Sequence, residues 1–319
     1  VEKNLTIWYL PMKHLGAHGF MDCKYLDPQL KALFCFGDQQ IFLPHVYRWC
    51  RRRRIPFVAY VGTAHSLDSN FKSKVMNALF AAGTLRIYKK NPVLAKTSAA
   101  KEELRQLGVP HAVIAPVGLD NAVLKKNIPA DEKMRLRKEH GFEADDVILC
   151  NVSRLSWEKR PLELIDLFLQ VKGKKKFKLI IVGNGPLEEE LNEKIRKNGL
   201  EKEVKIYPNV PYEKMWEIYE MSDYYLNMNK GEIFGMAIME AVYYKTSVAA
   251  IRALGPSVTL KDMKGHKLCE NDDEMAEWIT GPYPSEKDLQ ESSEKMAATF
   301  TWDRCADAFL QASSEKSSR

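Results

Sequence analysis

Short apolar runs alternate with longer amphipathic runs along most of the chain, and this alternation limits the fold more than any other feature. Runs of the short type, bounded by turn residues as strands are, include FVAYVG, VILCNV, KLIIVG and TSVAAI. Between them lie segments whose apolar residues recur at helical spacing, such as SAAKEELRQLG and RPLELIDLFLQVK. Strands that alternate with helices form parallel sheets. The sequence therefore predicts an α/β protein.

Two domains are expected from the length of the chain. At 319 residues it exceeds the size at which a single core stops growing, roughly 250 residues. The polar stretch PVGLDNAVLKKNIPADEK interrupts the alternation and is typical of a hinge. We predict a first domain over residues 1–118, a second over 119–296 and a terminal helix over 297–319. Further strands of the first domain are predicted at LTIWYL, ALFCFG and AVIAPVG.

Cysteine spacing and hydropathy favour a protein of the cytoplasm. The six cysteines lie far apart, without a C-x-x-C pair or a Cys/His cluster at zinc spacing, which argues against a structural metal. No apolar run approaches the roughly 20 residues of a membrane-spanning helix, and the first residues lack the layout of a signal peptide.

Positive charge is concentrated in the first part of the chain. Residues 1–118 contain 17 Lys and Arg against 7 Asp and Glu, a balance of +10, whereas the whole chain carries +6. The segment from Pro44 to Arg54 combines apolar residues with Arg51–Arg54 and predicts a basic amphipathic helix. Such a helix can lie on an anionic membrane, where each cation contributes about 1 kcal/mol. The protein is therefore expected to be peripheral on the inner face of the plasma membrane; the alternative is a solvated helix end.

Residues that follow the strands are the candidate site, because ligands bind at the carboxyl ends of parallel strands. After VILCNV come Arg154 and Lys159, five apart, in front of a helix that begins at Pro161. Two cations beside a helix N-terminus can stabilise a diphosphate as a leaving group. The alternative interpretation is a solvated basic loop.

Glu232 and Glu240 flank the start of another predicted helix. The strand YYLNMN should end near Asn229 and the helix should begin near Gly235, so that Glu232 lies in the loop and Glu240 lies inside the helix. A loop carboxylate near a sugar and a helix carboxylate that accepts two hydrogen bonds from a ribose diol form a plausible site. A glycosidase pair is disfavoured, because its two carboxyl groups must face each other across about 5–9 Å.

Two further loops are candidates with weaker signals. Gly183 and Gly185 follow the strand KLIIV and allow close backbone approach to a ligand, with Pro186 opening a helix. Gly62 and His65 follow the strand FVAYV, and a histidine there can hydrogen-bond a sugar hydroxyl. Most loops of either kind are ordinary turns.

Taken together these segments resemble the retaining, nucleotide-sugar-dependent glycosyltransferases of the GT-B fold, family 4 (glycosyltransferase group 1). The segments that carry the resemblance are PVGLD (116–120), NVSRLSWEKRPLELI (151–165), VGNGPLEEEL (182–191), EIFGMAIME (232–240), which matches the family's E-x7-E, and TWDRCADAFL (301–310). The resemblance implies two Rossmann-like domains facing a cleft and a C-terminal helix that crosses back to the first domain. The chain departs from the family at Ile233, at Met228–Asn229 and in a first domain that is short by roughly 50 residues.

The resemblance also implies roles for the candidate residues. Arg154 and Lys159 would hold the donor diphosphate, Glu240 would bind the ribose, and His65 would approach the donor sugar. The remaining donor contacts would come from Glu232, Phe234, Gly235, Met236, Gly62 and Gly183, with Asn209 and Val210 against the base. Glu232, His65, Arg154 and Lys159 are the expected catalytic group.

The implied reaction is hexosyl transfer with retention of configuration and without a metal or other cofactor. The donor would be a nucleotide-sugar, with UDP favoured over GDP, and the acceptor a glycan or lipid-linked molecule of cell-surface polysaccharide or glycolipid synthesis. No nucleic-acid partner is expected. Two alternatives remain: a nucleotide-sugar epimerase or phosphorylase of the same fold, and a non-catalytic polyanion-binding protein, which leaves the two glutamates without a role.

Overall fold

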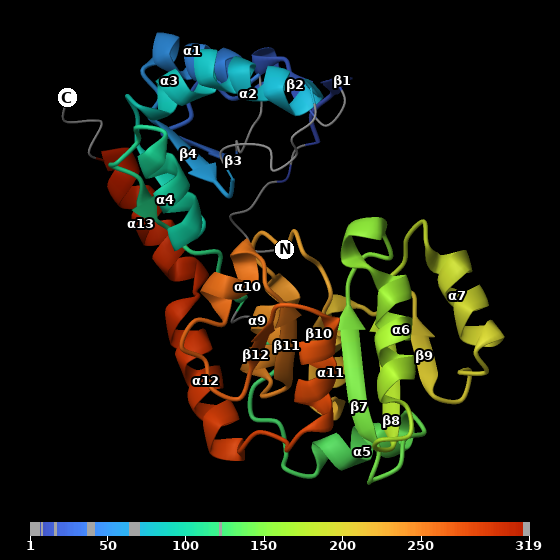
Figure 1. Cartoon of the computed structure of the whole chain (residues 1–319). Coiled ribbons are helices and arrows are strands. Elements are labelled where there is room, and N and C mark those ends of the chain that lie inside the picture. The colour runs from blue at the N-terminus through green and yellow to red at the C-terminus, as the bar shows by residue number, and fades with distance from the viewer. Residues whose placement is uncertain are drawn as a thin grey trace. The chain divides into compact units, whose positions relative to one another are not determined.

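The structure is a computed structural model of the chain that describes residues 7, 9–15, 18–36, 42–63, 71–120 and 123–314 (Figure 1). It divides into two compact units. The smaller unit comprises Val1–Val117 and Asp303–Arg319, and the larger unit comprises Gly118–Trp302. The predicted terminal segment 297–319 is therefore shared, with residues 297–302 in the larger unit and the remainder in the smaller unit.

The larger unit is built on a six-stranded parallel sheet. Its strands are β7 (Val147–Val152), β8 (Phe177–Val182), β9 (Val204–Tyr207), β10 (Tyr224–Asn227), β11 (Ser247–Ile251) and β12 (Lys267–Cys269). They lie in the order β12-β11-β10-β7-β8-β9, so the first and fourth strands of the unit, β7 and β10, are neighbours. Read from β9 this is the order 3-2-1-4-5-6 of a Rossmann sheet, whose topological switch point lies between β7 and β10.

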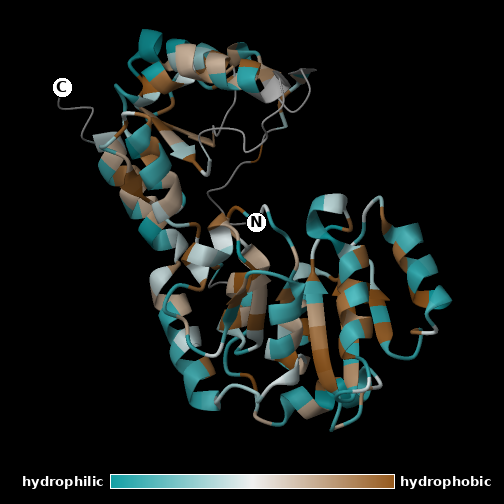
Figure 2. Ribbon diagram, in the orientation of Figure 1, coloured by the Kyte–Doolittle hydropathy of each residue, from teal (hydrophilic) through white to brown (hydrophobic). Residues whose placement is uncertain are grey.

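Helices pack on both faces of this sheet. They are α5 (Glu132–Glu139), α6 (Pro161–Val171), α7 (Glu188–Lys197), α8 (Met215–Met221), α9 (Met236–Tyr243), α10 (Leu254–Thr259), α11 (Asp272–Thr280) and α12 (Glu286–Thr299). Helix α6 contacts α7 and α11 on one face, whereas α9 contacts α8 and α12. Figure 2 shows hydrophobic colour on the strands and hydrophilic colour on outer surfaces such as that of α7.

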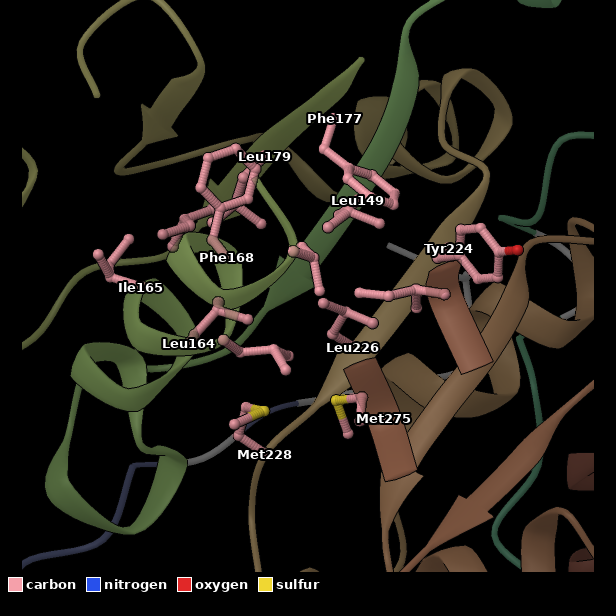
Figure 3. Packing of buried hydrophobic residues seen from close by; sticks show 14 of the residues in the cluster. Leu149, Leu164, Ile165, Phe168, Phe177, Leu179, Tyr224, Leu226, Met228 and Met275 are labelled. Carbon is pink, nitrogen blue, oxygen red and sulfur yellow. The ribbon is translucent and has the colours of Figure 1, made fainter. Parts of the chain in front are cut away.

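The core between α6, α11 and the sheet is made of large apolar side chains. Figure 3 shows Leu164 and Phe168 of α6 packed beside Leu149 of β7 and Leu179 of β8, with Met275 of α11 nearby. These five side chains are almost completely buried. Burial of this kind stabilises by about 1.5–3 kcal/mol per large apolar side chain, which holds the strand ends that carry the site.

The smaller unit has a four-stranded parallel sheet in the order β3-β4-β5-β6. Its strands are β3 (Leu33–Phe36), β4 (Phe57–Val61), β5 (Val93–Ala95) and β6 (Val113–Ile114), and its helices are α1 (Leu43–Arg53), α2 (Phe71–Ala82), α3 (Thr84–Tyr88), α4 (Ser98–Gln106) and α13 (Trp302–Ser314). Helix α13 packs Cys305 and Ala312 against Val58 and Tyr60 of β4. An antiparallel hairpin, β1 (Met12–Leu15) and β2 (His18–Met21), stands apart from this sheet.

The predicted strands and helices of the larger unit are confirmed, and the errors fall mainly in the smaller unit. The predicted strand LTIWYL is wrong where it is described, because residues 7, 9 and 10 lie in no strand; the rest of it lies outside the described residues. The run AVIAPVG yields only the two-residue β6, and β5, the hairpin and α3 were not predicted. In the larger unit α5, α10, β12 and α12 were also missed. Each is either very short or too polar to show a clear apolar period.

The predicted basic helix forms as α1, but its apolar side is covered by its own unit. Leu43, Trp49 and Cys50 are buried, and Val46 packs against the same core. The exposed side chains include Arg48 and the charged end, Arg51–Arg54. Any contact of α1 with an anionic surface is therefore electrostatic and does not involve its apolar face. Across the described ranges, no helix combines the length and the apolar character required to span a membrane.

Candidate active site

The loops that follow β7 and β10 meet at the switch point of the larger sheet. The loop after β7 includes a 3₁₀ helix, η2 (Trp157–Lys159), and the loop after β10 runs from Met228 to Gly235. Lys159 Nζ donates a hydrogen bond to Glu232 Oε2 at 2.8 Å, which joins residues 73 apart in the sequence. The structure therefore brings together a predicted cation and a predicted carboxylate at the carboxyl ends of neighbouring strands.

Two asparagines hold the Glu232 carboxylate in addition to Lys159. Asn229 Nδ2 lies 3.2 Å and Asn227 Nδ2 3.5 Å from Glu232 Oε2. Burial alone would raise the pKa of Glu232, but the hydrogen bond and positive charge of Lys159, with the two amides, outweigh it and leave this pKa below its ordinary value. Glu232 is therefore a stable anion. The asparagines were not predicted as site residues, although Asn229 stands where the sequence departs from the family.

The backbone of the same loop is fixed at Glu232 by a neighbouring glycine. Gly255 N donates to Glu232 O at 2.8 Å. A Cβ at Gly255 would lie 2.5 Å from Phe234 N, so no larger residue fits there without displacement of the loop. Gly255 was not predicted, because the segment RALGPS resembles an ordinary turn.

Arg154 lies on the loop after β7 and is exposed. Its guanidinium forms no hydrogen bond or ion pair with any part of the chain that the structure describes, so it is available to an anion. The backbone around it is held by the loop after β8, where Leu155 N donates to Asn184 O at 2.9 Å. The structure therefore fixes the base of the Arg154 side chain and leaves its charged end in solvent.

Gly183 and Gly185 pack against that loop. A Cβ at Gly183 would lie 2.0 Å from Ser153 O, and one at Gly185 would lie 2.4 Å from Leu155 O. Gly183 also has φ +136°, in the region that favours glycine. The close backbone approach predicted for these glycines is thus made to the neighbouring loop. The prediction that Pro186 opens a helix is wrong by two residues, because α7 begins at Glu188.

Glu240 lies in the second turn of α9, and its side chain is buried. It is 7% exposed. Tyr219 Oη donates to Glu240 Oε2 at 2.7 Å, and Tyr212 Oη lies 3.3 Å from Glu240 Oε1. Burial raises the pKa of Glu240 above its ordinary value, and the two tyrosine hydrogen bonds offset this only in part.

A pocket opens beside Glu240. It is small and is lined by Val123, Leu124, Tyr212, Met215, Trp216, Tyr219, Glu240 and Tyr244. All of these residues belong to the larger unit. The pocket is therefore aromatic and apolar, with one carboxylate.

Helix α9 begins in a way that suits an anion. Gly235 is its N-cap with φ +86°, and no side chain caps the first turn. The N–H groups of a helix N-terminus are a common anion site. Phe234, on one side of Gly235, is buried with its ring centroid 6.0 Å from that of Phe300, and Met236, on the other side, is half-buried.

The remaining predicted residues lie on other loops. Asn209 is exposed and Val210 half-buried after β9, and this loop is tied to the Gly183 loop because Asn184 Nδ2 donates to Pro208 O at 3.1 Å. Gly62 is buried at the end of β4, in the smaller unit. His65 lies outside the described residues. Among the residues that are described, no three His, Cys, Asp or Glu side chains are grouped to hold a metal ion.

A comparison with models of protein families assigns this chain to a family. Residues 132–296, just over half of it, match the family model of the glycosyl transferases group 1. The chain belongs to this family. The matched segment contains the cations after β7 and both glutamates around α9.

Individual relatives are distant. D-inositol 3-phosphate glycosyltransferase of Mycobacterium avium is 26% identical over 297 residues, covering 82% of this chain and 65% of the relative. Alpha-monoglucosyldiacylglycerol synthase of Streptococcus pneumoniae is 24% identical over 139 residues, covering 43% of this chain and 32% of the relative. The chain thus spans about two thirds or less of the length of these relatives.

Solved structures show the same fold. Anabaena Alr3699/HepE in complex with UDP and glucose superimposes with a TM-score of 0.71 at 19% identity, covering 89% of this chain and 78% of that chain. Sucrose-phosphate synthase from Thermosynechococcus elongatus superimposes with a TM-score of 0.66 at 17% identity, covering 83% and 69% respectively. The fold of this chain is therefore GT-B, with two Rossmann-like α/β units.

Proposed function

We propose that this chain is a retaining hexosyltransferase that moves a sugar from a nucleotide-sugar donor, UDP-sugar in preference to GDP-sugar, to a glycan or lipid-linked acceptor of cell-surface polysaccharide or glycolipid synthesis. The observation that carries the proposal is the Lys159–Glu232 contact at the switch point between β7 and β10, next to the uncapped start of α9. Relatives named as glycosyltransferases, and the UDP and glucose bound in Alr3699/HepE, support it.

Positive groups at the switch point suit a diphosphate leaving group. The ammonium of Lys159, the exposed guanidinium of Arg154 and the first N–H groups of α9 all lie at the carboxyl ends of β7 and β10. Charge develops on the diphosphate as the bond to the sugar breaks, and fixed positive groups stabilise that charge. Glu232 would keep the ammonium of Lys159 in position through their 2.8 Å bond.

Glu232 is also suited to orient the donor sugar. Its three side-chain partners all donate to Oε2, which leaves Oε1 to accept a sugar hydroxyl. Because its pKa is lowered, the carboxylate is ionised at neutral pH and is a strong acceptor. In this proposal Glu232 binds the sugar and His65 approaches it from the smaller unit.

Transfer would take place on one face of the sugar. The bond from the anomeric carbon to the diphosphate oxygen breaks, the acceptor oxygen forms its bond on the same face, and the departing phosphate oxygen takes the acceptor's proton. This route retains the configuration and requires neither a protein nucleophile nor a metal. Glu240 would bind the ribose, with Asn209 and Val210 beside the base and Gly62 and Gly183 near the donor.

The acceptor side would use the basic surface of the smaller unit. Arg51–Arg54, Lys89 and Lys90 are all exposed. A cluster of this kind is attracted to anionic lipid by about 1 kcal/mol per cation. We propose that the unit contacts the membrane where a lipid-linked acceptor resides. Replacement of Arg51–Arg54 by Gln should reduce sedimentation with anionic vesicles, and unchanged sedimentation would contradict the membrane contact.

Thermal unfolding with UDP-sugars and GDP-sugars tests the proposed function. A ligand at 100 times its dissociation constant stabilises the folded state by about 2.7 kcal/mol, which raises the melting temperature by several degrees. The stabilising donor is then assayed for release of its nucleoside diphosphate with candidate acceptors, with and without a chelator. Phosphate-dependent turnover would indicate a phosphorylase, and conversion of the donor without transfer would indicate an epimerase. No stabilisation by any nucleotide-sugar, with salt-sensitive binding of nucleic acid, would favour the polyanion-binding protein.

A further inference from the structure

The two oxygens of the Glu240 carboxylate have different partners. Oε2 accepts a 2.7 Å hydrogen bond from the hydroxyl of Tyr219, whose side chain is completely buried. Among the residues that the structure describes, Oε1 is paired only with Tyr212, at 3.3 Å, and Tyr212 is 46% exposed. One bond is therefore short and buried, whereas the other is longer and only partly buried.

Tyr219 is held firmly in its place. Its ring stacks on that of Tyr244 with an interplanar angle of 10° and lies 6.2 Å from the ring of Tyr225. Its carbonyl accepts a hydrogen bond from Thr246 Oγ1 at 2.9 Å. The hydroxyl of Tyr244 is occupied elsewhere, as it accepts a hydrogen bond from Lys125 N at 2.9 Å. Tyr219 thus cannot move away from Glu240 without disturbing several buried contacts.

Tyr212 can leave its position more easily. It lies in a one-turn 3₁₀ helix, η3 (Tyr212–Lys214), in which no residue is buried. A 3.3 Å hydrogen bond is weaker than one of 2.7 Å, and a donor of equal strength can replace it. The Tyr212 hydroxyl is consequently the group that a ligand hydroxyl can displace.

We propose that Tyr219 is a positioning residue that fixes one oxygen of Glu240, and that Tyr212 is a removable cap on the other oxygen, which gives way to a ribose hydroxyl of the nucleoside diphosphate. This inference rests on the proposed function and extends it. Glu240 then recognises the ribose with an oriented, half-occupied carboxylate, so little reorganisation is needed on binding.

The two tyrosines should act differently on affinity. Replacement of Tyr219 by Phe leaves Glu240 unanchored and removes a donor to its charged form, so UDP affinity should fall by about three- to tenfold. Replacement of Tyr212 by Phe removes a competitor for Oε1, so UDP affinity should stay unchanged or rise by up to about threefold. Preference for UDP over 2′-deoxy-UDP should diminish in the Tyr219 variant only.

A pH profile separates positioning from a purely structural role. The ionisable groups around Glu240, on every element that packs against it, are Tyr212, Tyr219, Tyr225 and Tyr244, with Lys125 on the linker and Asp120 close to Tyr212. Burial raises the pKa of Glu240, and the Tyr219 hydrogen bond lowers it. Loss of that bond should shift the acid limb of UDP binding upward by about 0.5 in pH or more.

The experiment is calorimetric titration of the full chain with UDP and 2′-deoxy-UDP between pH 4.5 and 8. It compares the wild type with Tyr219→Phe, Tyr212→Phe and the matched control Tyr283→Phe, whose hydroxyl donates to Asp223 O at 3.2 Å and is absent from the pocket lining. The control should bind like the wild type.

The outcomes distinguish this inference from the proposed function. An unchanged acid limb and unchanged 2′-hydroxyl preference in folded Tyr219→Phe would overturn the positioning role. A clear loss of affinity in Tyr212→Phe, at a side chain that is 46% exposed, would overturn the removable cap. If the wild-type chain bound neither UDP nor GDP, the proposed function itself would fail. With wild-type UDP binding intact, the tyrosine results bear on this inference alone.

Discussion

Glu232 and Glu240 stand eight residues apart around the start of α9, yet their surroundings shift their pKa values in opposite directions. Glu232 faces the ammonium of Lys159 and two amides, and its pKa is lowered. Glu240 faces two tyrosine hydroxyls in an aromatic pocket, and burial raises its pKa. Environments that separate the pKa values of similar groups commonly assign them different tasks.

The difference teaches how one short segment can serve two parts of a ligand. The loop position offers fixed charge, which suits a diphosphate and a sugar hydroxyl. The helix position offers a carboxylate that needs hydrogen-bond donors, which suits a diol. The turn at Gly235 separates the loop that carries Glu232 from the helix that carries Glu240. The two glutamates therefore lie in different surroundings and can bind different parts of one ligand.

The largest effect on stability is expected from a substitution that displaces the loop after β7, which carries Lys159. Gly183→Ala places a Cβ 2.0 Å from Ser153 O at φ +136°, and we expect destabilisation above about 4 kcal/mol or failure to fold. Gly173→Ala is the matched control, because Gly173 also has positive φ, +86°, but a Cβ there would have no atom of the described residues within 4 Å. It should lose only about 1 kcal/mol. Thermal unfolding measures both, and equal losses would contradict the packing role of Gly183.

Removal of the positive charge of Lys159 should weaken the binding of a diphosphate and leave the binding of the nucleoside unchanged. In Lys159→Ala the affinity for UDP should fall about 100-fold, because the charge opposite the diphosphate is lost, while the weaker binding of uridine should change little. Lys176→Ala is the control, since Lys176 forms an exposed ion pair with Asp145. Calorimetry measures all three proteins. An equal loss for uridine and UDP would show that Lys159 acts on the fold and not on the diphosphate.

Neutralising each glutamate should change stability with opposite sign. The lowered pKa of Glu232 means that its charge stabilises the fold above the unfolded value near 4.5, and that this contribution is lost as pH falls through the folded value. The raised pKa of Glu240 means that its charge opposes folding at neutral pH, and that this penalty fades as pH falls through its raised value towards 4.5.

At pH 7 Glu232→Gln should therefore melt lower and Glu240→Gln higher than the wild type, each by about 2–4 °C for an effect near 1 kcal/mol. The Glu240 difference should shrink as the pH falls towards 4.5, and the Glu232 difference should shrink only below 4.5. Differential scanning calorimetry across this range measures them, and shifts of the same sign would remove the contrast between the two carboxylates.

The smallest effect on stability is expected from substitutions of Arg160, which follows Lys159. Arg160 has φ +55°, and its guanidinium is bound by Asp272 at 2.8 and 3.0 Å. Arg160→Ala loses the ion pair and keeps the backbone strain, whereas Arg160→Gly loses the ion pair and relieves the strain. The Gly variant should be more stable than the Ala variant by about 1 kcal/mol. Chemical denaturation of the two variants tests this order.

Much of the larger unit could be predicted from sequence, because its strands are long apolar runs and its helices have a clear apolar stripe. That Lys159 and Glu232 lie at the same edge of the sheet was predicted from one rule, that ligand-binding loops follow the carboxyl ends of parallel strands. The hydrogen bond between them was not predicted. The tyrosines around Glu240 could not be predicted in this way. Tyr212 and Tyr219 lie in a segment whose pattern predicts only a helix, and their role depends on the packing of that helix against α9.

Other features could not be predicted from the sequence, for different reasons. The partners of Gly183 became evident only as contacts between two loops, since a G-x-G turn looks the same whether it faces a ligand or the chain. In the smaller unit, β5 and β6 have three and two residues, too few to show a period. These short strands are placed by the packing of Leu94 and Ala115 with Val58 and Tyr60 of the predicted strand β4, and not by a local pattern of their own.

The most direct test is a crystal structure of the chain with the nucleoside diphosphate that stabilises it. We predict the diphosphate at the first turn of α9, in contact with Lys159 and Arg154, and a ribose hydroxyl within hydrogen-bond distance of Glu240 Oε1. A diphosphate bound away from the β7 and β10 loops, or a ribose that does not reach Glu240, would contradict the division of tasks between the two glutamates.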